Sequence, residues 1–358
     1  MGSSLLGRPG AVGETTAVHY GNPLGEQKKL ASGDAVVDLG DHDVITLSGP
    51  DRLVWLNSIS SQDFLGLPPA HTVESLILDP NGHVEHRFLA VDDGSALWLL
   101  AEPGASEALV AWLRKMRFRM QVEIEVVSAQ WSVLAAIGQH PTPPSSPINS
   151  AGSSPVLWHD PWPNIQPGAV GYGPEPHPGE GLSLVYWLHP RELLAPESYP
   201  EWAGSAALDA LLVRSARPTL HGEVDEKLLP HEVDWIRTAI HLEKGCYRGQ
   251  ETVAKVHNLG HPPRRVVLLH LDGSGGELPE PGSDVTLGDK KVGHITRAVR
   301  HFEWGPLALA LVKRVTDTDA ELQVAGPDGP IASTQDVLVP QDAGATRREA
   351  IRQKRSGG

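Results

Sequence analysis

Proline and glycine divide this chain of 358 residues into segments of different character. The 31 prolines and 37 glycines both exceed average usage, and much of the proline is clustered. The densest cluster lies at residues 141–155, where proline is mixed mainly with serine. Because proline and serine in such density favour open loops over regular structure, residues 141–155 are predicted to form an exposed linker.

The segment before this linker predicts a first α+β domain, residues 20–140. Two hydrophobic runs flank the pair Asn81-Gly82, which is typical of a β-hairpin. Apolar residues recur at helical spacing within residues 106–120, which indicates an amphipathic helix. Strands and helices that alternate in this way favour a layer of helices on an antiparallel sheet.

Three further parts follow the linker. Residues 156–260 contain strand patterns and a helical pattern after Pro200, and they predict a second α+β segment. Residues 262–340 contain short strand patterns separated by Gly- and Pro-rich turns, which is typical of a small β-barrel. Residues 341–358 end in a basic stretch with almost no apolar side chains, and they predict a disordered tail.

Charge, hydropathy and cysteine content disfavour several functional classes. The 30 basic and 44 acidic residues give a net charge of −14, which disfavours a general binder of nucleic acid or anionic membranes. No stretch approaches the roughly 18 apolar residues of a transmembrane helix, and the first residues do not resemble a secretory signal. We therefore expect a cytoplasmic protein without membrane association, and a monomer. Cys246 is the only cysteine, which excludes an internal disulfide and a cysteine-only zinc or iron–sulfur site within one chain.

The most informative stretch surrounds this cysteine. Cys246 lies between two glycines in a turn-prone loop, and glycine permits close backbone approach to a ligand. Lys244 and Arg248 place positive charge beside the sulfur, which favours a thiolate. Gln250 and Glu251 add an amide and a carboxylate, which are suited to hydrogen-bonding the edge of a heterocycle. Because buried structural cysteines usually have apolar neighbours, these polar residues favour a functional thiol over a packing role.

Residues 244–251, Lys-Gly-Cys-Tyr-Arg-Gly-Gln-Glu, resemble the signature of the folate-binding iron–sulfur maintenance proteins of the YgfZ type. That family shares the fold of the glycine cleavage system T-protein, an aminomethyltransferase. At average residue usage, six fixed letters occur by chance in a chain of this length less than about once in 10^5. A looser similarity extends over residues 37–57, 217–232 and 292–310.

The resemblance implies a T-protein-like arrangement of three domains around a central folate cavity, of α+β class, with a small C-terminal β-barrel. It implies tetrahydrofolate, or a folate derivative, as the cofactor. It also implies iron–sulfur enzymes as clients, including those that thiolate tRNA, and Cys246 as the functional thiol in the catalytic position. The residues that it predicts to bind the cofactor are Lys244, Gly245, Tyr247, Gly249, Gln250, Glu251 and Arg217.

The alternative function is that of a tetrahydrofolate-dependent aminomethyltransferase. Those enzymes carry paired aspartates in a turn and strand, and the corresponding stretch here has Glu85 and His86 instead. The extra methylene of a glutamate displaces its carboxylate by roughly an ångström, and errors of that size are costly in catalysis. We therefore expect an accessory protein rather than a classical enzyme.

Two groups of basic residues, and the histidines, can be explained either by a structural or by a functional role. Arg214 and Arg217 end a predicted helix, where guanidinium groups either match the carboxylates of a folate tail or face water. Residues 114–119 interleave four cations with Phe118, a pattern that suits RNA but also the solvated face of a helix. We expect no direct RNA binding in so acidic a chain. No histidine pair has helix-face ligand spacing beside a carboxylate, so we expect no metal site.

Overall fold

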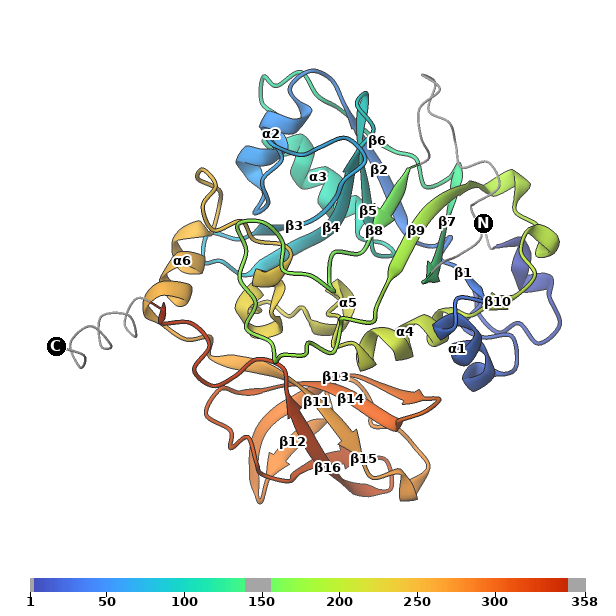
Figure 1. Cartoon of the computed structure of the whole chain (residues 1–358), viewed down its shortest axis with the longest axis vertical. Helices are drawn as coiled ribbons and strands as arrows, with labels where there is room; N and C mark the ends of the chain where they lie inside the picture. Colours follow the sequence, from blue (N-terminus) through green and yellow to red (C-terminus); the bar gives the residue numbers. More distant parts are fainter. Residues whose placement is uncertain (1–2, 139–155, 347–358) are drawn as a thin grey trace.

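The computed structural model describes residues 3–138 and 156–346. Its framework is three β-sheets, two of them open and one closed into a barrel (Figure 1). This mixed α and β architecture with a C-terminal barrel confirms the fold class that the sequence predicts. No helix in these two ranges is long and apolar enough to cross a membrane.

The first sheet is antiparallel, with the order β3-β4-β5-β2-β6. The hairpin predicted around Asn81-Gly82 joins β3 and β4 and is confirmed. Two helices cover one face of this sheet, where Trp55 and Leu109 pack in one core with Phe88. The elements of this layer are β2 (Asp43–Ser48), α2 (Arg52–Ile59), β3 (Thr72–Leu78), β4 (Val84–Asp92), β5 (Ala96–Ala101), α3 (Ser106–Met116) and β6 (Glu123–Val126).

The second sheet has the order β10-β1-β7-β9-β8 and draws on both sides of the predicted linker. Its strands are β1 (Val36–Asp38), β7 (Trp131–Ile137), β8 (Leu157–His159), β9 (Leu184–Pro190) and β10 (Trp202–Ala203). Strands β1 and β7 fall within residues 20–140, so that segment does not form a separate domain. They are almost entirely buried and gain their partners β9 and β10 only from later in the chain. The linker predicted at residues 141–155 lies outside the described residues.

The C-terminal strands form the closed barrel β11-β14-β13-β12-β15-β16, which confirms the predicted barrel. Side chains alternate along its strands: Val267 and Leu269 fill the barrel, whereas Val266 and Leu268 join the core shared with the two open sheets. The strands are β11 (Arg264–Leu271), β12 (Asp284–Leu287), β13 (Lys290–His301), β14 (Gly305–Lys313), β15 (Leu322–Gly326) and β16 (Gly329–Val337).

The remaining helices connect these sheets. They are α1 (Pro23–Ala31), α4 (Ser205–Arg214), α5 (Leu220–Glu223), α6 (Gln250–Leu259) and the short 3-10 helices η1 (Ser4–Gly7), η2 (Arg191–Leu193), η3 (Pro196–Ser198), η4 (Pro230–Val233), η5 (Trp235–Arg237) and η6 (Gly273–Gly275). In Figure 1, α4 and α5 lie in the middle, between the two open sheets and the barrel.

The start of the predicted disordered tail is ordered. Ala343 and Ala345 are buried, and the Ala345 N–H donates to the Val256 carbonyl of α6 at 3.4 Å. The prediction of disorder is therefore wrong for residues 341–346, because hydrogen bonds from Ala345 to Val256 and between His261 and Ala343 hold them beside α6. The basic residues 347–358 lie outside the described residues.

Candidate functional site

The signature residues form a turn that leads into α6, beside the tip of the β3–β4 hairpin. Gly249 immediately precedes the helix and has a φ of +83°, a left-handed conformation that favours glycine. Cys246 is exposed in this turn, and a Cβ added to the neighbouring Gly245 would meet no atom within 4 Å. The only thiol of the chain is thus presented to solvent on a turn between two glycines, as the sequence suggests.

Lys244 makes contacts within the protein. Its Nζ donates hydrogen bonds to the carbonyl oxygens of Asn57, Ser60 and Gln62 at 2.5, 2.7 and 2.6 Å. Burial lowers the pKa of Lys244 to about 8, against an opposing effect of Asp63, so the ammonium form predominates at neutral pH. An ammonium group has three donors, and here each has an acceptor.

The glycines of the signature and of the hairpin turn interlock. A Cβ on Gly249 would lie 2.7 Å from the Asp79 carbonyl oxygen and 3.0 Å from the Gly82 Cα. A Cβ on Gly82 would in turn lie 2.9 Å from the Thr252 Cβ of α6. Since real Cβ atoms do not approach other atoms so closely, both positions require glycine for the hairpin and α6 to touch.

Arg248 binds the hairpin from the other side. Its guanidinium donates to both carboxylate oxygens of Glu85, at 2.7 and 3.3 Å. Burial, with the Arg248 cation nearby, lowers the pKa of His86 to about 4, so this imidazole is neutral at physiological pH. Glu85 and His86, which the resemblance aligns with the paired aspartates of aminomethyltransferases, are therefore an ion-paired glutamate and a neutral histidine.

The other signature residues support the turn or face solvent. The Gln250 side chain donates to the Lys244 carbonyl oxygen at 3.3 Å, which closes the turn on itself. The Tyr247 ring is buried, with the Lys244 Nζ 5.4 Å from its centroid. Glu251 is exposed on the first turn of α6. Of the signature residues predicted to bind the cofactor, Gly245 and Glu251 make none of these packing or hydrogen-bond contacts with the described residues.

Arg217 lies in a buried charge network. Its Nε donates to Asp160 at 3.0 Å and its Nη1 to Glu74 at 3.1 Å. Glu74 on β3 also accepts hydrogen bonds from Arg87 at 2.6 Å and from the Thr238 hydroxyl. Arg217 is 1% exposed, so its guanidinium stabilises the junction between the two open sheets and does not face solvent.

A cavity of about 350 Å³ opens next to this network, where the three sheets meet. Its walls come from β4, the end of β5, β9, α4, α5 and β13. The polar side chains among its lining residues include Arg87, Glu102, Tyr186, Thr219, His221 and Arg297. None of the seven residues predicted to bind the cofactor lines this cavity.

His221 and Glu102 form the most accessible polar pair of this central cavity. The His221 Nδ1 lies 2.9 Å from Glu102 Oε2, and the hydrogen bond raises the pKa of His221 against the effect of burial. Burial would raise the pKa of Glu102, but His221, Arg87 and backbone N–H groups outweigh it and hold that pKa at about 2. The sequence did not indicate that Arg87, Glu102 and His221 line one cavity, because they are far apart in the chain and match no motif.

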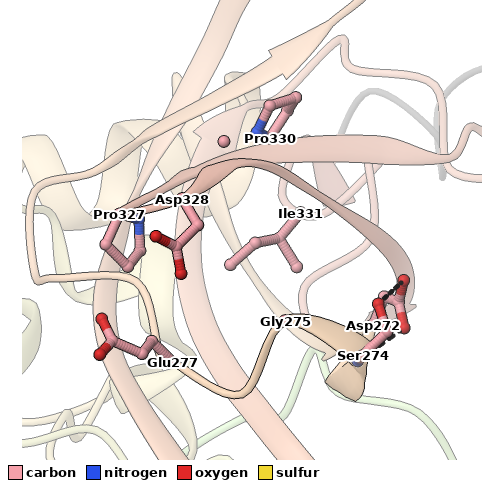
Figure 2. Close-up of a pocket in the computed structure, with 9 residues that line it drawn as sticks. Asp272, Ser274, Gly275, Glu277, Pro327, Asp328, Pro330 and Ile331 are labelled. Carbon is pink, nitrogen blue, oxygen red and sulfur yellow. Dashed lines mark hydrogen bonds between the residues drawn. The ribbon is translucent and has the colours of Figure 1, made fainter.

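A second hollow, of about 110 Å³, lies at the β15–β16 turn of the barrel (Figure 2). Asp272, Glu277 and Asp328 contribute carboxylates to its wall. Such a wall repels the carboxylates of a folate, and no predicted site residue lies there. Within residues 3–138 and 156–346, no group of three or more His, Cys, Asp or Glu side chains could hold a metal ion.

Comparison with known proteins finds relatives that are named as transferases, as an iron–sulfur cluster assembly factor and as tRNA-modifying proteins. A chloroplastic protein of Arabidopsis thaliana, named only as a transferase, is 27% identical over 74% of this chain and 62% of its own length. An iron–sulfur cluster assembly factor, the mitochondrial IBA57 homolog of Mycosarcoma maydis, is 25% identical over 68% of this chain and 58% of its own length. The tRNA-modifying protein YgfZ of Photobacterium profundum is 23% identical over 81% of this chain and 87% of its own length. The chain therefore spans less than two thirds of the first two of these relatives.

A solved structure shows the same fold. The glycine cleavage system aminomethyltransferase T of Bartonella henselae superposes with a TM-score of 0.70 and 18% identity, over 96% of this chain and 97% of that one. Curated aminomethyltransferases are also among the sequence relatives. No family model matches the chain. The chain is thus related to the YgfZ-type proteins and has the fold of the T-protein, as its signature predicts.

Proposed function

We propose that this protein is a tetrahydrofolate-binding accessory protein for the assembly or repair of iron–sulfur enzymes, including tRNA-thiolating ones, with Cys246 as the functional thiol. The observation that carries the proposal is the exposed position of the only cysteine on a turn that its signature neighbours hold in place. The relatives named as an iron–sulfur cluster assembly factor and as tRNA-modifying proteins support this class of function.

The central cavity is our proposed site for the folate. Its volume of about 350 Å³ lies within the roughly 300–1,000 Å³ typical of small-molecule pockets. Arg87 and His221 provide nitrogen donors for a ligand carboxylate, and Tyr186 and Thr219 provide hydroxyl groups. Bound tetrahydrofolate would supply a reduced pterin that carries one-carbon units. The signature residues then act mainly on the position of the thiol, and the cavity residues bind the ligand.

A rescue experiment tests the thiol. We expect Cys246→Ala and Cys246→Ser to fold like the native protein, because the side chain is exposed, and to lose the rescue of iron–sulfur enzyme activity in cells that lack this protein. Circular dichroism and thermal unfolding provide the control for the fold. Full rescue by either variant contradicts the role of the thiol.

A titration under anaerobic conditions tests the ligand. The ten tryptophans provide a fluorescence signal, and saturable quenching by tetrahydrofolate is expected. His221→Ala should weaken binding by about tenfold, the value of one lost charge-assisted hydrogen bond. Lys291→Ala, an exposed position on the barrel, is the matched control. Absence of binding, or equal weakening by both variants, contradicts a folate in this cavity.

The second candidate function is aminomethyl transfer, which the T-protein fold and the aminomethyltransferase relatives favour. In this chain it would depend on Glu85, whose carboxylate is engaged by Arg248. An aminomethyl-transfer assay with tetrahydrofolate decides between the candidates. Turnover that is abolished by Glu85→Gln would support the transferase, and no turnover by the native protein would exclude it.

A further inference from the structure

The three carbonyl oxygens that Lys244 contacts belong to the end of α2 and the residues that follow it. Asn57 lies in the last turn of that helix, Ser60 is its C-cap, and Gln62 is two residues beyond. The carbonyl groups at a helix C-terminus have no partner within the helix and carry a partial negative charge. Lys244 therefore caps α2 from a position more than 180 residues later in the chain.

The cap is part of a longer seam between the two segments. The Ser61 hydroxyl donates to the Ala239 carbonyl at 2.6 Å, and the His241 N–H donates to the Ser61 carbonyl at 3.0 Å. The Gln62 side chain donates to the Thr238 carbonyl at 2.8 Å. Lys244 makes the last contacts of this seam before the chain turns out to the exposed Cys246.

The number of donors decides between two roles for Lys244. If its ammonium bound a ligand carboxylate, at least one N–H would have to face the ligand. All three are occupied by carbonyl oxygens at 2.5–2.7 Å, and the residue is half-buried. A ligand contact would therefore break an existing charge-assisted hydrogen bond, which costs more than an ordinary one.

We propose that Lys244 is the positioning residue of the Cys246 thiol: its ammonium caps α2 and thereby fixes the turn that presents the sulfur. This proposal rests on the proposed function only for the statement that the turn serves to present a functional thiol. Only Gly245 lies between Lys244 and the cysteine, so loss of the Lys244 contacts frees one side of the turn. Gly249 and Arg248 hold the other side against the β3–β4 hairpin.

The single cysteine makes the test specific. A methanethiosulfonate spin label reacts at Cys246 alone, and its electron paramagnetic resonance spectrum reports the motion of this turn. We expect Lys244→Met to shorten the rotational correlation time of the label by about threefold, because loop motion on the nanosecond scale is released. Lys244→Arg should do the same, because a planar guanidinium fork does not direct three donors to one converging set of carbonyls. Lys255→Met, an exposed lysine of α6, is the control.

Chemical rescue separates positioning from general destabilisation. In Lys244→Ala, n-propylammonium supplies the missing carbons and the ammonium, and it should restore the native label spectrum. Val267→Ala in the barrel core lowers stability far from the turn and should leave the label unchanged. If Lys244→Met does not fold, Lys244→Ala can be refolded with n-propylammonium. The motion of the label is then compared before and after the amine is diluted out.

Either of two results overturns the proposal: native label motion in both the Met and Arg variants, or the same mobilisation by Val267→Ala. These spectra are measured without folate or client enzymes. Normal cellular rescue by Cys246→Ala would therefore contradict the proposed function and leave the role of Lys244 in the turn standing.

Discussion

At the scale of single residues, the signature combines one exposed reactive group with neighbours that hold it. The sequence identified Cys246 correctly as an exposed residue, because a thiol among polar residues and glycines is unusual for a structural cysteine. It did not show the contacts of Lys244, since their acceptors are backbone carbonyls, which leave no trace in side-chain identity. The motif letters therefore indicated the exposed thiol but not the contacts that hold its turn.

The two glycines beside Cys246 give a matched pair of variants. Gly249→Ala places a methyl group 2.7 Å from the Asp79 carbonyl in a backbone of φ +83°. We expect it to lower the free energy of unfolding by about 1–3 kcal/mol, from strain and displacement of the hairpin. Gly245→Ala meets no neighbouring atom and should change it by less than about 0.5 kcal/mol. Urea denaturation measures both, and equal effects would contradict the interlocked turns.

At the scale of elements, strand β4 connects the signature with the central cavity. Glu85 near its beginning binds Arg248, and Arg87, two residues later, lines the cavity and joins the buried charge network. The hairpin was predictable from the Asn-Gly turn and its flanking hydrophobic runs. The network was not, because its members Glu74, Arg87 and Arg217 come together only when two sheets pack.

This network makes stability depend on acid pH. Burial would raise the pKa of Glu74, but Arg217 and Arg87 outweigh it and hold that pKa at about 2. The pKa of Glu102 is also about 2, held there by His221, Arg87 and backbone N–H groups. Both pKa values lie below those of the unfolded chain, near 4.5, so the unfolded state binds more protons between these limits. The stability is therefore present above about pH 4.5 and is lost as the pH falls toward 2. Urea unfolding at a series of pH values should show this slope, and a flat profile from pH 5 to 3 would contradict it.

At the scale of the whole molecule, the barrel is joined to the rest of the chain by polar as well as apolar contacts. Arg297 of β13 donates to Asp209 on α4 at 2.7 Å, to Glu223 on α5 at 3.0 Å and to the Arg217 carbonyl at 2.6 Å. Repeated short strands predicted the barrel itself. Which strands make up each open sheet was less predictable, because the Pro/Ser-rich stretch falls in the sequence between β7 and β8, two strands of the same sheet.

Removal of this link should loosen the barrel. Arg297→Met leaves Glu223 buried without its ion partner, and loss of one side of a buried pair costs about 3–5 kcal/mol. We expect thermal unfolding to occur at a lower temperature, with the barrel melting first. Arg300→Met on the same strand removes only an exposed contact and is the control. Equal melting curves for the two variants would show that apolar packing alone holds the barrel.

The exposed thiol also limits the valency of the molecule. With one sulfhydryl per chain, oxidation of this protein alone can join two copies and no more, so its own disulfide-linked species are dimers and not longer chains. Both sulfurs of such a dimer are consumed, and a thiolate must attack this disulfide before either sulfur is free again. Each copy can likewise form only one mixed disulfide at a time, and a reductant recovers its free thiol.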